Sequence, residues 1–182
     1  MTYYSKEHET IICRLIHLVS RLITQPEIIL KIVSSKVMLV RMFLYFNRQF
    51  KSLRPYVLKV LYSLFKLKDK LNDYISEYDI NTKTFVQEAK AMLVESMETW
   101  NREDFINLSG LVSSSLDCFP ESATEYSDLV AGLTDILKDR LELERKNAAV
   151  LVAKLARNEE VKKVMVKHHT MEVLMSLGNN VL

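Results

Sequence analysis

The chain has 182 residues, of which 48% are apolar, and these figures fit one globular domain with a sizeable core. Only three glycines and three prolines occur in it. β-Sandwiches and barrels need many tight turns built on such residues, so the composition excludes an all-β fold. Leu, Lys, Glu, Met and Ala are plentiful and favour helix, so we expect an all-α protein.

The net charge of +2 hides a strong asymmetry along the chain. Residues 1–70 carry 13 Lys and Arg against 4 Asp and Glu, residues 71–144 carry 5 against 16, and residues 145–182 carry 7 against 3. Segregated charge can steer partners of opposite sign. The alternative is that the solvated faces of the helices simply differ in composition.

Two cysteines, Cys13 and Cys118, lie far apart, which is not a disulfide framework and suits the cytoplasm. The N-terminal sequence has acidic residues before its apolar stretch and no small-residue cleavage site, so we expect no secretory signal. Basic residues interrupt the apolar segment 11–46 throughout, so we expect no transmembrane span there.

Helical patterns follow one another along the whole chain with short breaks. In the first, Ile11, Leu15, Leu18 and Leu22 recur at helical spacing, while Pro26 suits the first turn of the second. Phe119-Pro120 predicts a helix end, and Gly178 predicts another. The predicted helices cover residues 7–24, a short segment from 26, 35–47, 54–65, about 70–76, 84–97, 102–118, 124–138, 143–157, 159–167 and 170–177.

The breaks between a long apolar helix and the short helix after it recur along the chain. They fall near residues 25, 68, 120 and 159, at intervals of about 43, 52 and 39 residues. A recurrence in this range is typical of a helical solenoid, in which each repeat buries its apolar face against its neighbours. We therefore expect residues 1–182 to form a single helical repeat domain.

The best-preserved copy, Arg145–Leu177, contains in order Asn147-Ala148-Ala149, Leu155-Ala156, Asn158-Glu159-Glu160 and Val173–Leu177. This order of residues resembles an armadillo repeat. It departs from that pattern near Thr170, where the family usually has a glycine. The resemblance implies a right-handed α-solenoid of about three to four degenerate repeats. Chaperone adaptors that combine tetratricopeptide and armadillo repeats, including those for myosin or axonemal dynein assembly, end in such arrays.

In armadillo proteins the third helix of each repeat lines the partner-binding face. Peptide-carrier members have Trp and, four residues later, Asn on that helix. The matching pairs here are Val150 with Lys154, Leu111 with Ser115, and Lys59 with Ser63, none of which is Trp with Asn. The resemblance therefore implies a folded or helical partner rather than a nuclear-import peptide, in a groove that Lys59 and Lys154 make locally basic. Trp100 is either a wedge between helices or an exposed recognition anchor.

Motifs for chemistry are sparse. Glycine occurs only at 110, 132 and 178, which allows no glycine-rich phosphate loop. Cys13 and His17 have the spacing of half a zinc site, without a visible second half, and His168-His169 is interpreted as solvent-facing. The acidic residues at 95, 98, 103 and 104 are interpreted as helix-end charges. We therefore expect no metal, cofactor, small-molecule substrate or catalytic activity.

These patterns predict a non-catalytic scaffold or adaptor that binds protein partners, with a chaperone client as one candidate. The alternative is a peripheral binder of anionic membrane or nucleic acid that uses the basic segment 31–70. The helix at 7–24 lacks the polar face that caps a solenoid end. We therefore expect either that the chain is the C-terminal part of a longer repeat protein or that this helix packs on a partner.

Overall fold

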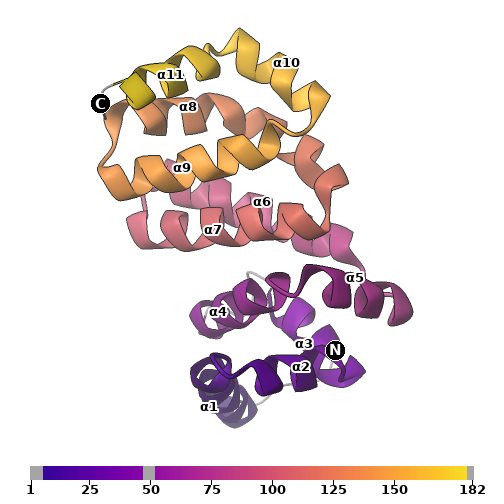
Figure 1. The fold of residues 1–182 in the computed structure, drawn as a ribbon. Helices are drawn as coiled ribbons and strands as arrows, with labels where there is room; N and C mark the ends of the chain where they lie inside the picture. The colour runs from indigo at the N-terminus through magenta and orange to yellow at the C-terminus, as the bar shows by residue number, and fades with distance from the viewer. Residues whose placement is uncertain (1–5, 47–51, 180–182) are drawn as a thin grey trace. The chain divides into compact units, whose positions relative to one another are not determined.

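The computed structural model describes residues 6–46 and 52–179, and the side chains of residues 10–46 and 52–178. Over these residues it contains α-helices, one 3-10 helix and no β-strand, which confirms the all-α prediction (Figure 1). The elements are α1 (Lys6–Leu22), α2 (Pro26–Val33), α3 (Lys36–Tyr45), α4 (Arg54–Phe65), α5 (Lys68–Glu77), α6 (Thr82–Glu98), α7 (Arg102–Cys118), η1 (Pro120–Leu129), α8 (Val130–Asp139), α9 (Glu142–Leu155), α10 (Glu159–Lys167) and α11 (Thr170–Asn179).

The chain divides into two compact units, residues 1–88 and residues 89–182, with the boundary inside α6. In the first unit α1 and α3 pack against α4, and α2 packs against α5. An aromatic cluster fills its core, since the rings of Phe43 and Phe46 lie 5.5 and 4.9 Å from that of Phe85. Phe65 completes the cluster at 5.3 Å from Phe85. Aromatic side chains bury large areas, so this cluster holds the helices of the unit together.

In the second unit α9 packs along α7 and also against α8, while α11 packs on α8 (Figure 1). The short helices η1 and α10 pack against each other. A hydrogen bond of 2.8 Å joins the buried hydroxyls of Thr134 on α8 and Thr170 on α11. The helices of this unit thus bury one another on several sides.

Helix starts follow recognisable local signals. Pro26 occupies the first turn of α2, where its missing N–H leaves no hydrogen bond unmade. The side chain of Asn101 caps α7 by accepting from the backbone N–H of Asp104, and it donates to the Asp104 carboxylate at 2.9 Å. Asn158 caps α10 in the same way through the N–H groups of Glu160 and Val161.

The structure corrects the predicted helix at residues 124–138. Residues 120–129 form the 3-10 helix η1, and α8 begins only at Val130. The buried side chains Ala123, Tyr126 and Leu129 recur every three residues, which is the period of a 3-10 helix. The hydroxyl of Ser122 also donates to the carbonyl of Phe119, which tightens the first turn.

Three non-glycine residues hold a left-handed backbone at helix junctions. Asp79, Trp100 and His169 have φ angles of 53°, 50° and 55°. Asp79 precedes α6 and His169 precedes α11, so each lies where a short helix gives way to the next helix. The armadillo pattern usually has a glycine near Thr170. His169 lies immediately before Thr170, and its backbone has the left-handed conformation that glycine favours.

Candidate partner-binding surface

Four described helices of 12 or more residues each end just before a helix of ten residues or fewer, and we call them the third helices: α1, α4, α7 and α9. The residues that immediately precede the following short helices are Gln25, Leu67, Phe119 and Asn158. The backbone at two of these breaks matches closely, because Gln25 and Asn158 each donate to the carbonyl three residues before at 3.0 Å. We call each of these residues the break, and equivalent positions in the four helices are those that lie the same number of residues before it.

The register reveals a shared buried stripe. Counting back 14, 10, 7 and 3 residues from each break gives side chains that are almost wholly buried in α4, α7 and α9. They are Leu53, Val57, Val60 and Leu64; Phe105, Ser109, Val112 and Leu116; and Glu144, Ala148, Leu151 and Leu155. Because the same positions turn inward in three helices, the remaining faces of these helices are also comparable.

The same register gives an exposed stripe on α4 and α9. Positions 12, 8, 5 and 1 residues before the break are all exposed in both helices. We call these stripes the open faces. The first consists of Pro55, Lys59 and Tyr62 on α4 with Lys66 just after it, and the second consists of Lys146, Val150 and Ala153 on α9 with Arg157 shortly after it. Each combines apolar and basic side chains, and the ammonium of Lys66 lies 4.6 Å from the centre of the Tyr62 ring.

Two predicted site residues lie on these open faces. Lys59 is exposed on α4, and Val150 is exposed on α9. Ser63 is half-buried, and its hydroxyl donates a hydrogen bond of 3.1 Å to the backbone carbonyl of Lys59. Tyr62, Lys146 and Arg157 share these faces although the motif did not select them. Helical spacing from Lys59 and Val150 was the signal that could have found them.

Two other predicted residues require correction. Leu111 and Ser115 on α7 have no exposed surface, so they cannot contact a partner on this face. α7 turns other positions toward solvent, since Asn107 is exposed and Gly110 and Ser114 are half-buried. The apolar side chain of Leu111 turns into the core instead.

Lys154 is not a free basic group in a groove, which corrects a second expectation. Its ammonium donates to both carboxylate oxygens of Asp117 on α7 at 2.5 Å, and Arg157 donates to the same carboxylate at 2.8 Å. Partial burial acts to raise the pKa of Asp117, but the hydrogen bonds from Lys154 and Arg157 outweigh it and lower that pKa. The cluster therefore ties α9 to α7 and leaves one excess positive charge.

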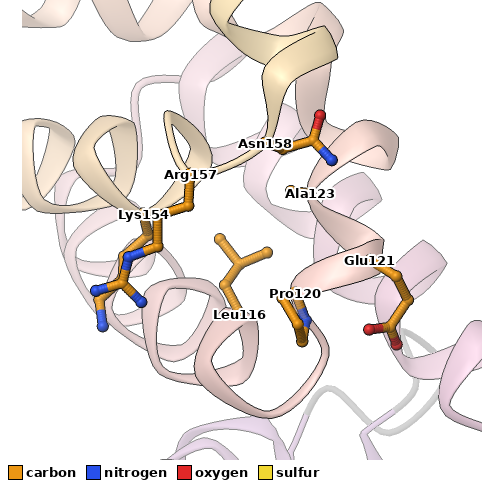
Figure 2. A pocket seen from close by; sticks show the side chains of 7 residues that line it. All are labelled: Leu116, Pro120, Glu121, Ala123, Lys154, Arg157 and Asn158. Atoms are coloured by element: carbon orange, nitrogen blue, oxygen red, sulfur yellow. The ribbon is translucent and has the colours of Figure 1, made fainter.

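A small cavity of about 270 Å³ lies beside this cluster. Figure 2 shows Leu116 between Lys154 and Arg157 on one side and Pro120 and Glu121 on the other. Binding pockets for organic ligands measure about 300–1,000 Å³, so this cavity has the size for one side chain of a partner rather than a cofactor.

Replacing Asp117 with asparagine is expected to lower the free energy of unfolding by about 1–2 kcal/mol at pH 7, because the charge-assisted hydrogen bonds from Lys154 and Arg157 lose their anion. The pKa of Asp117 is lowered in the folded state, so its contribution is present at neutral pH and is lost as the pH falls below 3.8 through the lowered pKa. Urea unfolding at pH 7 and pH 3 measures both effects. Asp128→Asn, which removes the more exposed pair with Lys90, is the control and should have the smaller effect. Equal losses at both pH values would contradict this account of the cluster.

Trp100 lies in the turn between α6 and α7 and is partly exposed. One face of its ring is covered by the guanidinium of Arg140 at 3.6 Å, and its ring centre is 6.0 Å from that of Phe105. A cavity of about 330 Å³ that it shares with Met97 and Gly132 opens next to it. Trp100 therefore combines contacts to two neighbours with a partly exposed surface, and Arg140 would have to move before a partner could stack on that ring face.

The residues considered as metal ligands make other contacts. The ring of His17 stacks on Tyr56 at 4.5 Å, and the thiol of Cys13 lies 3.7 Å from the carbonyl oxygen of Ser52. His169 is exposed and faces Glu172 at 3.4 Å. Within the part of the chain that the structure describes, no group of three or more His, Cys, Asp and Glu is placed to hold a metal ion.

No family model matches the chain, and no curated protein or solved structure matches it significantly. Among the described helices, none combines the length and apolar character that crossing a membrane requires. The functional assignment therefore depends on the residues of this chain and on the arrangement of its helices.

Proposed function

We propose that the chain is a non-catalytic α-solenoid scaffold that binds a protein partner through the open faces of α4 and α9. The observation that carries the proposal is the recurrence of exposed residues at the same four positions of both helices, above a buried stripe that also recurs. Each compact unit therefore offers one such face to a protein partner, on α4 in the first unit and on α9 in the second.

Helix packing inside each unit supports a repeat of three elements. Third helices pack on third helices, as α1 does on α4 and α9 does on α7. The elements that follow them pack in the same order, α2 on α5 and η1 on α10, and α8 packs on α11. In each pair the second helix is the third element after the first, which supports armadillo-like repeats. The left-handed backbone at His169 supports them further.

The chemistry of the open faces indicates the kind of partner. Tyr62 and Val150 supply exposed apolar surface, and Lys59 and Lys146 supply exposed positive charge. A protein segment that carries apolar anchors flanked by carboxylates complements this combination. A chaperone client, as in myosin or axonemal dynein assembly, is the narrower form of this proposal. It is supported by the likeness of Arg145–Leu177 to an armadillo repeat. Cys13 and Cys118 form no disulfide with each other, which suits a cytoplasmic setting.

Affinity capture followed by mass spectrometry tests the proposal. Lys59→Glu combined with Val150→Glu changes both open faces without touching a buried group, and it should lower the recovery of the specific partner at least tenfold. Lys83→Glu combined with Val166→Glu repeats the same chemistry at exposed positions on α6 and α10, and it should leave recovery unchanged. Lys154→Glu is unsuitable for this test because it breaks the ion pair with Asp117.

Salt dependence separates the proposal from binding to anionic membrane or nucleic acid. Capture by the open faces should persist in high salt, because part of the contact is apolar. Binding to anionic vesicles or RNA through residues 31–70 should collapse instead. Equal recovery by wild type and by the Lys59→Glu and Val150→Glu variant would refute the open faces as the binding surface.

A further inference from the structure

The first third helix, α1, differs from the others in the same register. Its residues 14, 10, 7 and 3 positions before Gln25 are Ile11, Leu15, Leu18 and Leu22. Their exposed fractions are 56%, 57%, 54% and 38%, whereas the equivalent side chains of α4, α7 and α9 are at most 4% exposed. The sequence therefore has a core stripe at this place, and the described structure leaves it uncovered.

The covering element is visible in two other copies. The helix that precedes the third helix packs against it, as α3 packs against α4 and α8 packs against α9. The equivalent stripe of α9, which includes Leu151 and Leu155, is buried in a unit where α8 lies against that helix. A helix in the corresponding place would lie against α1.

The exposed apolar surface of α3 also favours a helix at this place. α8 contacts both α9 and α11, and α3 follows α1 in the chain as α11 follows α9. α3 also leaves apolar side chains in solvent, since Val37 is 59% and Leu44 is 62% exposed. A single helix that takes the place of α8 would have apolar surface to meet on both α1 and α3.

We infer that the α1 stripe is a docking site for one amphipathic α-helix of a partner protein, which lies against α1 as α8 lies against α9. The charges at the site define that helix further. Arg14 and Arg21 are exposed beside the stripe, and the described side chains of α1, residues 10–22, include no carboxylate. The partner helix therefore carries apolar residues at helical spacing and carboxylates along its flank.

Two other occupants fit these observations less well. A second copy docking through its own α1 would bring Arg14 and Arg21 close to the same charges of its neighbour. A lipid surface would satisfy the apolar stripe and the arginines. The same four positions are buried in the other third helices, which pack against neighbouring helices of their own units, so a helix is the occupant that the fold favours.

A designed 18-residue peptide provides the probe: an amphipathic helix with leucines at helical spacing and glutamates on both flanks, labelled for fluorescence anisotropy. The full chain should bind it saturably, and a scrambled peptide of the same composition should bind at least tenfold more weakly. Leu15→Ser combined with Leu18→Ser should weaken binding at least tenfold. Val166→Ser combined with Met175→Ser, which changes exposed apolar residues on α10 and α11, should leave it unchanged.

A charge exchange keeps the test independent of the leucine variants. Arg14→Glu combined with Arg21→Glu should weaken binding of the glutamate-flanked peptide. The same variant should bind a lysine-flanked version of the peptide more tightly than the wild-type chain does. Failure of the wild-type chain to bind the designed peptide, or equal binding of the scrambled one, would overturn the inference. Self-association through α1 in sedimentation, or binding to phosphatidylserine vesicles without peptide binding, would overturn it in favour of the other occupants.

This site is separate from the open faces of α4 and α9. The variant with Lys59→Glu and Val150→Glu should retain full peptide binding at α1, so failure of one proposal leaves the other measurable.

Discussion

Replacing Arg102 with alanine is expected to lower the free energy of unfolding by about 2–4 kcal/mol, because it leaves the buried carboxylate of Glu144 without its counter-charge. The Glu144 side chain is only 2% exposed, and its oxygens accept from Arg102 Nε at 2.5 Å and from a terminal nitrogen at 3.4 Å. Because Arg102 is half exposed, its loss should lower the free energy of unfolding by less than the loss of one partner of an ion pair buried on both sides. Urea unfolding followed by circular dichroism measures the loss.

The repeat register sharpens this prediction. Glu144 occupies a position that holds Ile11, Leu53 and Phe105 in the other third helices, so a side chain of apolar type belongs to this place. Arg102→Met combined with Glu144→Leu should therefore restore stability to within about 1 kcal/mol of wild type, since well-packed apolar residues can replace a buried ion pair. A double variant that is less stable than Arg102→Ala alone would show that the ion pair itself is required.

Leu151→Ala and Leu18→Ala should have very different effects, although the two residues hold the same position of the register. Leu151 has no exposed surface, and its truncation should cost about 2–5 kcal/mol because a cavity forms between packed helices. Leu18 is 54% exposed, and its truncation should change stability by less than about 0.5 kcal/mol.

The same unfolding measurement compares the two variants, and Val60→Ala on α4 provides a third member of the series. Val60 is fully buried, so its truncation should resemble that of Leu151 more than that of Leu18. A large loss for Leu18→Ala in the isolated chain would contradict the uncovered stripe on α1.

Much of the fold could be predicted because its signals are local. Pro26 and Asn158 set helix starts through their own backbone and side-chain chemistry, and the spacing of Ile11, Leu15 and Leu18 requires a helix. The 3-10 helix at 120–129 could not be separated from α8 in this way. Its apolar period of three over one short segment resembles a helix start, and its contact with α10 joins segments that lie far apart in the sequence.

The candidate surface was harder to predict than the fold. The motif selected Lys59 and Val150, which are exposed, but it also selected Leu111 and Ser115, which α7 buries. A helix rotation of one residue decides between exposure and burial, and that rotation is set by tertiary packing rather than by spacing. The pairing of Lys154 with Asp117 joins residues 37 positions apart, which no local pattern reveals.

The measurement that tests the central claim most directly is hydrogen–deuterium exchange of the chain alone and in complex with a captured partner. The account predicts slower exchange on binding at residues 54–66 and 142–157, which contain the open faces of α4 and α9. It predicts little change at α10, whose exposed side chains lie outside those faces. Protection confined to α6, α8 and α10, with α4 and α9 unchanged, would contradict a scaffold that binds through its third helices.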